Sequence, residues 1–218
     1  MRHSTNHAPK TAGNVLHSAR WYDLVSRVIS LGRDKAVREK LIELAAPASG
    51  EMVLDVGCGT GTLAIAIKPH VDSGEVHGID ASPEMIQVAK KKSAKKGFDV
   101  DFRVALIEAI PFPDSFFDLV TSSLMLHHLS DDLKTQGLLE IWRVLKPGGR
   151  FMATDFAAHS HSSLGHLLSI LGRSRGESMV EKLTPMLRNA GFGDIENVAS
   201  RYKNFAFIRA RKPTPKMP

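Results

Sequence analysis

The chain has 218 residues, a net charge of +6 and 43% hydrophobic residues, which is the length and composition of one globular domain with a full core. No apolar run reaches the roughly eighteen residues needed to cross a bilayer, and residues 1–14 are too polar for a secretory signal. The single cysteine, Cys58, excludes an internal disulfide and a thiolate metal cluster, and it fits a reducing compartment. We therefore expect a cytoplasmic protein.

The positive charge is concentrated in two places. Five lysines fall between residues 90 and 96, and no acidic residue follows Glu196. Such clusters attract anionic membranes or nucleic acid, but no aromatic residues are interleaved with the lysines to stack on bases. We expect a solvated helix face and a frayed basic tail over residues 212–218. No nucleic-acid partner is expected, and a peripheral membrane contact stays open.

Strand-like and helix-like segments alternate in the central part of the chain. Hydrophobic runs predict strands over residues 52–56, 75–79, 101–105, 117–122 and 150–155. Helical spacing between them predicts helices over residues 63–68, 83–96 and 134–145. Strands separated by helices of this length form βαβ units, so we expect an α/β fold with a mainly parallel sheet.

Several of these elements have clear end signals. For the helix that starts at residue 83, Ser82 can accept a hydrogen bond from a free amide, and Pro83 suits the first helical position. Gly97 then provides a stop. The run LKPGG at residues 145–149 predicts a tight turn before the fifth strand.

A strand that ends in a glycine-rich loop is the strongest chemical signal. Residues 53–61 read VLDVGCGTG, and glycines at such a turn let a ligand approach the backbone closely. The loop lacks the Gly-Lys-Ser/Thr of a P-loop. Asp55, two residues before the first glycine, would repel a pyrophosphate but suits a ligand with an ammonium or sulfonium group.

A second signal is Asp80, at the end of the next strand and about twenty residues after the loop. An acid at this point accepts hydrogen bonds from the ribose hydroxyls of a nucleoside cofactor. A lone aspartate at a strand end is more often a helix cap or a solvated residue. Its register with the glycine loop favours the binding role.

Several ordered motifs together resemble the class I methyltransferases, which use S-adenosylmethionine. They are VLDVGCGTG at residues 53–61, GID at 78–80, EAIPFPDSFFD at 108–118, LHHL at 126–129 and LLEIWRVLKPGGRF at 138–151. The resemblance covers residues 51–155 and resumes weakly over 183–211. The opening RWYDLV at residues 20–25, followed by SLG at 30–32, is similar to the quinone C-methyltransferases of ubiquinone and menaquinone synthesis.

The resemblance implies a Rossmann-like α/β fold: a seven-stranded, mainly parallel sheet with helices on both faces and an antiparallel last strand. It also implies S-adenosylmethionine across the carboxyl ends of the strands, with the glycine loop around the methionine part and Asp80 on the ribose. The cofactor-binding residues carried over are Asp55, Gly57, Gly59, Thr60, Gly61, Asp80, Ala81, Met85, Leu106, Ile107, Glu108 and Ser123.

The expected domain organisation follows from the same resemblance. The whole chain, residues 1–218, would form a single methyltransferase domain. Its parts would be an N-terminal helical cap over residues 1–50, the cofactor-binding core over 51–156, a lid segment over 157–182, a final helix and strand pair over 183–211 and the basic tail over 212–218. In the final part, residues 192–199 and 204–210 predict an antiparallel pair of strands.

Two pairs of residues and one segment depart from the family pattern. The family usually has an acid or amide and a small residue before Glu108, where this chain has Leu106 and Ile107, so side-chain recognition of the adenine amino group is lost. The quinone enzymes typically carry an Arg-Asn pair where this chain has His127 and His128. They also have a longer segment after the fifth strand, and both differences count against the quinone assignment.

His127 and His128 follow the fourth strand, beside the expected methionine end of the cofactor. A sulfonium methyl is already activated, so the protein mainly aligns the acceptor, but a weakly acidic acceptor also needs a base. Histidine suits that task near neutral pH, and we predict one of the two as the base. The alternative is one packed and one solvated histidine. The predicted acceptor pocket is formed by Tyr22, Asp155, Leu164 and Leu168.

The expected function is methyl transfer from S-adenosylmethionine to a small-molecule or lipidic acceptor, such as a quinone or other aromatic compound. A metal site is not expected, because His159, His161 and His166 lie in a polar run without a fixed element to set ligand geometry. Residues 122–125 read SSLM and lack the Asn/Asp-Pro-Pro motif of base methylation. A cofactor-binding sensor or scaffold, and a nicotinamide-dependent oxidoreductase, stay open as alternatives.

Overall fold

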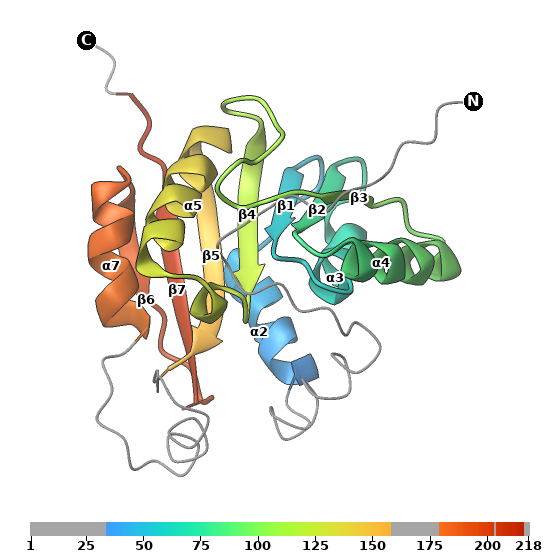
Figure 1. Cartoon of the computed structure of the whole chain (residues 1–218), viewed down its shortest axis with the longest axis horizontal. Helices are drawn as coiled ribbons and strands as arrows, with labels where there is room; N and C mark the ends of the chain where they lie inside the picture. Colours follow the sequence, from blue (N-terminus) through green and yellow to red (C-terminus); the bar gives the residue numbers. More distant parts are fainter. Residues whose placement is uncertain (1–33, 158–178, 203, 216–218) are drawn as a thin grey trace.

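The computed structural model describes residues 34–157, 179–202 and 204–215. These residues contain a seven-stranded sheet in the order β3-β2-β1-β4-β5-β7-β6 (Figure 1). The strands are β1 (Met52–Val56), β2 (Glu75–Asp80), β3 (Asp101–Val104), β4 (Phe117–Ser123), β5 (Leu145–Phe156), β6 (Gly193–Asn197) and β7 (Phe205–Arg211). The helices are α2 (Asp34–Ala45), α3 (Thr62–Val71), α4 (Pro83–Lys96), the 3-10 turn η1 (Leu126–His128), α5 (Asp131–Val144) and α7 (Met179–Asn189).

The strand directions agree with the expected α/β fold. The pairs β1–β2, β1–β4, β2–β3 and β4–β5 are parallel, whereas β7 runs antiparallel to both β5 and β6. From β1 the chain passes outward to β2 and β3 and then returns to β4 on the other side of β1. At such a reversal, parallel sheets of this kind bind their ligands in a crevice outside the carboxyl ends of the strands, which here are those of β1 and β4.

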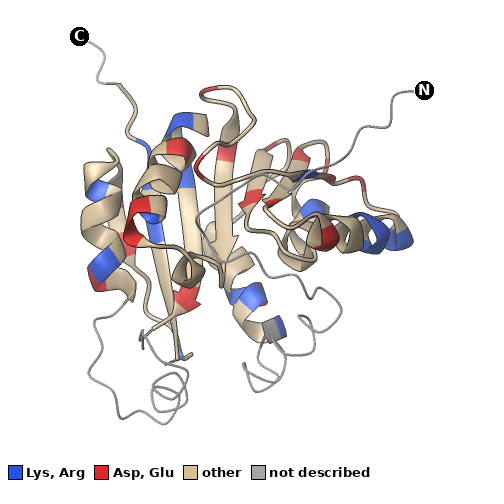
Figure 2. Ribbon diagram, in the orientation of Figure 1, with Lys and Arg blue, Asp and Glu red and all other residues tan. Residues whose placement is uncertain are grey.

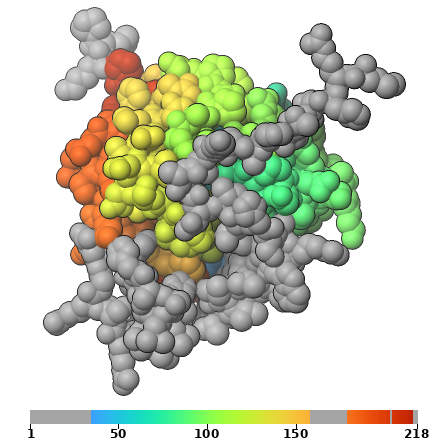
Figure 3. All heavy atoms as spheres, in the orientation of Figure 1, coloured from blue at the N-terminus to red at the C-terminus, as the bar shows by residue number. Residues whose placement is uncertain are grey.

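Helices cover both faces of the sheet. Apolar residues of α2, α3 and α4 pack with one face of the strands, and those of α5 and α7 pack with the other. The helices α5 and α7 contact each other and lie side by side on the face seen in Figure 3. Within the described ranges, no helix combines the length and the apolarity needed to span a membrane.

The helix α4 begins and ends as its sequence predicts. The hydroxyl of Ser82 accepts a hydrogen bond from the amide of Met85 at 3.3 Å, and Pro83 occupies the first turn. Gly97 ends the helix in the left-handed conformation, with φ of 70°. These local signals therefore fixed both ends of a helix whose first turn borders the crevice.

The region after α5 differs from the prediction of a tight turn. Leu145 to Gly149 already belong to β5, although Gly148 has a positive φ of 80° and the pairing with β4 shifts register between Phe117 and Leu119. The amide of Gly148 donates to the carbonyl of Lys212, and the amide of Lys212 donates to the carbonyl of Gly149. The chain beyond β7 thus extends the ladder along these glycines.

The expectation of a frayed basic tail is wrong for Lys212, which is only 7% exposed. Its ammonium donates to the carbonyls of Trp142 and Leu145, at 2.9 and 2.8 Å, and lies 3.9 Å from the ring centroid of Trp142. These carbonyls are at the C-terminal end of α5, where a cation offsets the helix dipole. Lys212 therefore anchors the chain after β7 to α5.

Candidate functional site

The glycine loop between β1 and α3 has a backbone that other residues adopt only with strain. Gly57 and Gly61 have φ values of 68° and 73°. A Cβ at Gly57 would lie 2.2 Å from Cγ of Met125, and one at Gly61 would lie 2.6 Å from the ring of Phe102. The loop therefore needs glycine for its conformation and for the close approach of its neighbours.

Asp80 is fixed beside this loop by two backbone amides. Gly59 donates to Oδ2 at 2.8 Å, and Ser82 donates to Oδ1 at 2.9 Å. Burial raises the pKa of the carboxyl, and the two amide bonds act in the opposite direction. A carboxylate has lone pairs beyond these two bonds, so an oriented Asp80 suits a pair of ribose hydroxyls. The glycine loop and this carboxylate fit the cofactor that the motifs imply, and the ribose role stays a prediction.

Asp55 is enclosed beneath the loop, with 1% of its surface exposed. Its Oδ1 accepts a hydrogen bond from the hydroxyl of Thr121 on β4 at 2.9 Å, and its carboxylate accepts another from the amide of Ala64 in the first turn of α3. Burial raises the pKa of Asp55 to about 7. In this position its carboxyl group links β4 to the start of α3 through these two hydrogen bonds, and a role toward the methionine part stays a prediction.

The lysines of α4 do not all form the solvated face that the sequence predicts. Figure 2 shows their charges gathered along α4, where Lys90, Lys91, Lys95 and Lys96 are exposed. Lys92 is different, because it donates hydrogen bonds to two threonine hydroxyls of the loop region.

These hydroxyls belong to Thr60 and Thr62, at 2.8 and 2.9 Å from the Lys92 ammonium. Thr60 is 3% exposed, so its side chain is enclosed by protein, and its role toward the methionine part stays a prediction. Lys92 was missed as a site residue, because the lysine-rich helix gave no sign of which side chain turns inward.

The residues predicted to border the adenine are partly in the core. Met85 is buried, and Ile107 packs on Gly137 of α5, where a Cβ would lie 2.6 Å from the isoleucine. Only the backbone of Ile107 is therefore left for a ligand. Ala81, Leu106 and Glu108 are partly exposed and stay candidates for the adenine wall.

Arg143 holds the segment that follows Glu108. Its guanidinium donates to the carbonyls of Ile110 and Phe112, each at 2.9 Å. It also pairs with Glu140, whose other contact is the amide of Ile110 at 2.9 Å. Glu140 and Arg143 both lie in the run LLEIWRVLKPGGRF, which the sequence analysis had singled out. The spacing of that run did not show that these side chains bind the segment after Glu108.

The two predicted histidines lie in η1, shortly after β4, and next to the glycine loop through Met125. Nδ1 of His127 is 2.7 Å from Oδ1 of Asp155, which is completely buried at the end of β5. The ring centroids of His127 and His128 are 3.9 Å apart. Burial, together with the neighbouring His127, lowers the pKa of His128 to about 4. Ser123, predicted near the methionine end, is the last residue of β4 and is partly exposed.

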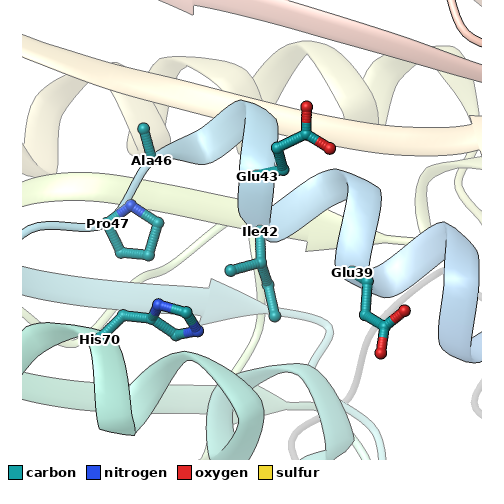
Figure 4. A pocket seen from close by; sticks show the side chains of 6 residues that line it. All are labelled: Glu39, Ile42, Glu43, Ala46, Pro47 and His70. Carbon is teal, nitrogen blue, oxygen red and sulfur yellow. The ribbon is translucent and has the colours of Figure 1, made fainter.

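Other parts of the predicted pocket fall outside the described residues: Tyr22, Leu164 and Leu168, with most of the expected lid. Two hollows on the surface of the described residues contain none of the predicted site residues. One has a volume of about 320 Å³ and lies at the far end of α3 from the glycine loop (Figure 4). It is lined by Glu39, Ile42, Glu43, Ala46, Pro47 and His70. The other, of about 490 Å³, lies between α2 and residues 199–202.

Comparison with known proteins finds methyltransferases. Residues 53–149 match the model of a methyltransferase domain. A demethylmenaquinone methyltransferase from Thermus thermophilus is 36% identical over 144 residues. Over this region the chain is similar to methyltransferases. The match covers 66% of this chain and 64% of the Thermus protein, so the chain spans slightly less than two thirds of that methyltransferase.

Solved structures support the methyltransferase fold. A SAM-dependent methyltransferase from Aquifex aeolicus is 24% identical with a TM-score of 0.70, covering 91% of this chain and 100% of that one. The [4+2]-cyclase SpnF is 21% identical with a TM-score of 0.68, covering 94% and 100%. Because a protein named as a cyclase shares the architecture, the fold alone does not decide the reaction.

Proposed function

We propose that the protein transfers the methyl group of S-adenosylmethionine to a small-molecule or lipidic acceptor, with an aromatic acceptor of the quinone type as the leading candidate. The observation that carries this proposal is the coupled arrangement of the glycine loop and Asp80, in which the Gly59 amide donates to the carboxylate. The loop brings backbone close to the ligand, and the carboxylate presents acceptor oxygens to a ribose. That combination suits a nucleoside with a positively charged aminoacyl part.

The acceptor class rests on two further observations. The Thermus relative is named for a menaquinone precursor, which is an aromatic lipid. Beside the glycine loop, η1 presents a histidine pair that suits an acceptor with a removable proton. We propose His127 or His128 as the base, with Tyr22, Leu164 and Leu168 in the acceptor pocket. A cytoplasmic location and a peripheral membrane contact through the exposed lysines of α4 belong to the same proposal.

The proposal is tested by calorimetry with S-adenosylhomocysteine, followed by an assay of radiolabelled methyl transfer to candidate quinols. Replacing Asp80 with Ala should weaken binding by about 1–3 kcal/mol, because charge-assisted hydrogen bonds to the ribose are lost. A matched control is Asp72→Asn, an exposed aspartate at the other end of α3. Its affinity should stay at the wild-type value.

The outcomes separate the alternatives. Binding of the nucleoside with transfer to a quinol supports the methyltransferase, whereas binding without transfer to any acceptor favours a sensor or scaffold. Uptake of a nicotinamide dinucleotide in place of the nucleoside would favour an oxidoreductase. Equal affinity in wild type and Asp80→Ala would contradict the ribose role.

A further inference from the structure

The Asp155 carboxylate is buried and held in one orientation, whereas a residue that only lines a pocket needs neither. Its side chain is 0% exposed at the end of β5. Oδ1 accepts a hydrogen bond from the backbone amide of Phe156 at 2.8 Å, and Oδ2 accepts one from the backbone amide of His127 at 3.0 Å. Two backbone bonds from two different segments therefore orient the carboxylate before any ligand binds.

The same carboxylate contacts the His127 imidazole at 2.7 Å through Nδ1. A carboxylate oxygen can only accept, so in the neutral imidazole Nδ1 carries the hydrogen and Nε2 keeps its lone pair. Because Nε2 is across the ring from Nδ1, it lies on the side away from the buried carboxylate. The His127 side chain is 21% exposed, and Phe156 packs edge-on against it at 5.1 Å, so the ring is held in place with one edge open.

The two histidines are therefore not equivalent. Among the described contacts, the carboxylate bond belongs to the His127 ring, while His128 packs against that ring at 3.9 Å. Within residues 34–157, 179–202 and 204–215, no hydrogen-bond acceptor is seen that would select one tautomer of His128. The geometry thus favours His127 over His128 as the base, a choice that the sequence left open.

We propose that Asp155 is a positioning residue that holds His127 in the tautomer of a general base, and that the acceptor carries a phenolic hydroxyl. This inference rests on the methyltransferase function proposed above. A neutral imidazole can remove a proton from a phenol, whereas an acceptor without an acidic hydrogen would gain nothing from an oriented base. An ionised phenol is nucleophilic at its oxygen and at the ring carbons ortho to the hydroxyl position, so methylation at oxygen and at carbon both remain within the proposal.

In the proposed step, Nε2 of His127 takes the hydroxyl proton. The resulting phenolate attacks the methyl carbon, and the carbon–sulfur bond breaks with its electron pair remaining on sulfur. If oxygen attacks, the proton passes from His127 to solvent. If a ring carbon attacks, its hydrogen leaves as a proton, and the oxygen regains its proton from His127. One proton is released for each methyl transferred in either case.

The test uses the full chain with S-adenosylmethionine and two probes. The first is 1,4-naphthoquinol, and the second is a ring-fluorinated naphthoquinol whose hydroxyl is already ionised at the assay pH. With the first probe, Asp155→Asn and His127→Gln should each lower kcat by about 10²-fold, the usual contribution of a general base. With the second, the loss should nearly vanish, because no proton needs to be removed. His70→Gln, an exposed histidine at the far end of α3, is the matched control.

A second measurement does not depend on turnover. Nitrogen-15 NMR of labelled histidines should show His127 with hydrogen on Nδ1 in the wild type, and a mixed or reversed tautomer in Asp155→Asn. Calorimetry with S-adenosylhomocysteine should give the same affinity for both proteins, which excludes a general loss of structure.

Each contrary result has its own meaning. An unchanged kcat in Asp155→Asn, an equal loss with both quinols, or a wild-type His127 with hydrogen on Nε2 would overturn the positioning role. If the wild type binds the nucleoside but methylates neither quinol, the phenolic acceptor is wrong. If it does not bind the nucleoside at all, the proposed function itself fails.

Discussion

Replacing Asp55 with Asn is expected to stabilise the unliganded protein above pH 7 and to flatten the pH dependence of its stability. Asp55 is enclosed between β1, Thr121 and the start of α3, and burial raises its pKa from 3.8 to about 7. The folded protein therefore holds this proton more tightly than the unfolded chain does. The resulting stability is fully present below about pH 4 and is lost as the pH rises through about 7.

The magnitude follows from the two pKa values. A difference of about three pH units, at about 1.4 kcal/mol for each, corresponds to about 4 kcal/mol of folding free energy above pH 7. Asparagine has nearly the same shape and stays neutral, so it avoids this cost. Weakened hydrogen bonds from Thr121 and Ala64 would offset about 1–2 kcal/mol. The net gain expected at pH 8 is therefore about 2–3 kcal/mol.

The assay is urea unfolding of wild type and Asp55→Asn at pH values from 5 to 8.5. The difference in unfolding free energy should grow with pH and level off above about 7. The exposed Asp72, changed to Asn, serves as control and should stay within about 0.5 kcal/mol of wild type throughout. A difference between wild type and Asp55→Asn that is constant over this range would refute the reasoning.

Three further predictions concern the same framework. The affinity for S-adenosylmethionine should fall between pH 8 and pH 6, because protonation of Asp55 removes a negative charge near a positive ligand; titration calorimetry at both pH values checks the sign. Gly57→Ala should lower the melting temperature and abolish cofactor binding, since its Cβ would lie 2.2 Å from Met125. Lys212→Met should cost about 1–3 kcal/mol in urea unfolding, because carbonyls at the end of α5 lose a buried donor; a loss below about 0.5 kcal/mol would contradict the anchoring role.

Local patterns predicted much of the architecture. Short apolar runs that end in glycine or aspartate gave β1 and β2, and capping residues gave both ends of α4. These features depend on near neighbours in the chain. The spacing of the last two strands predicted an antiparallel pair, and the family resemblance implied seven strands with an antiparallel last strand; the sheet confirms both.

Contacts between distant segments were not accessible in this way. Lys92 and Lys212 look like other surface lysines, and only the packing of α4 on the loop, or of the chain end on α5, turns them inward. Asp55 was predicted near the cofactor because a carboxylate there suits a positively charged ligand, but the sequence did not show that it is enclosed beneath the loop and bonded to Thr121. His127 and Asp155 were singled out separately, since a separation of 28 positions conceals a direct bond.

The contact between Gly57 and Met125 links the two halves of the site mechanically. Met125 immediately precedes η1, so any displacement of the glycine loop is transmitted over a short, packed path to the His127 ring. For the proposed methyl transfer, we therefore predict that filling the methyl-donor site also adjusts the His127 ring, and that the donor binds before the acceptor.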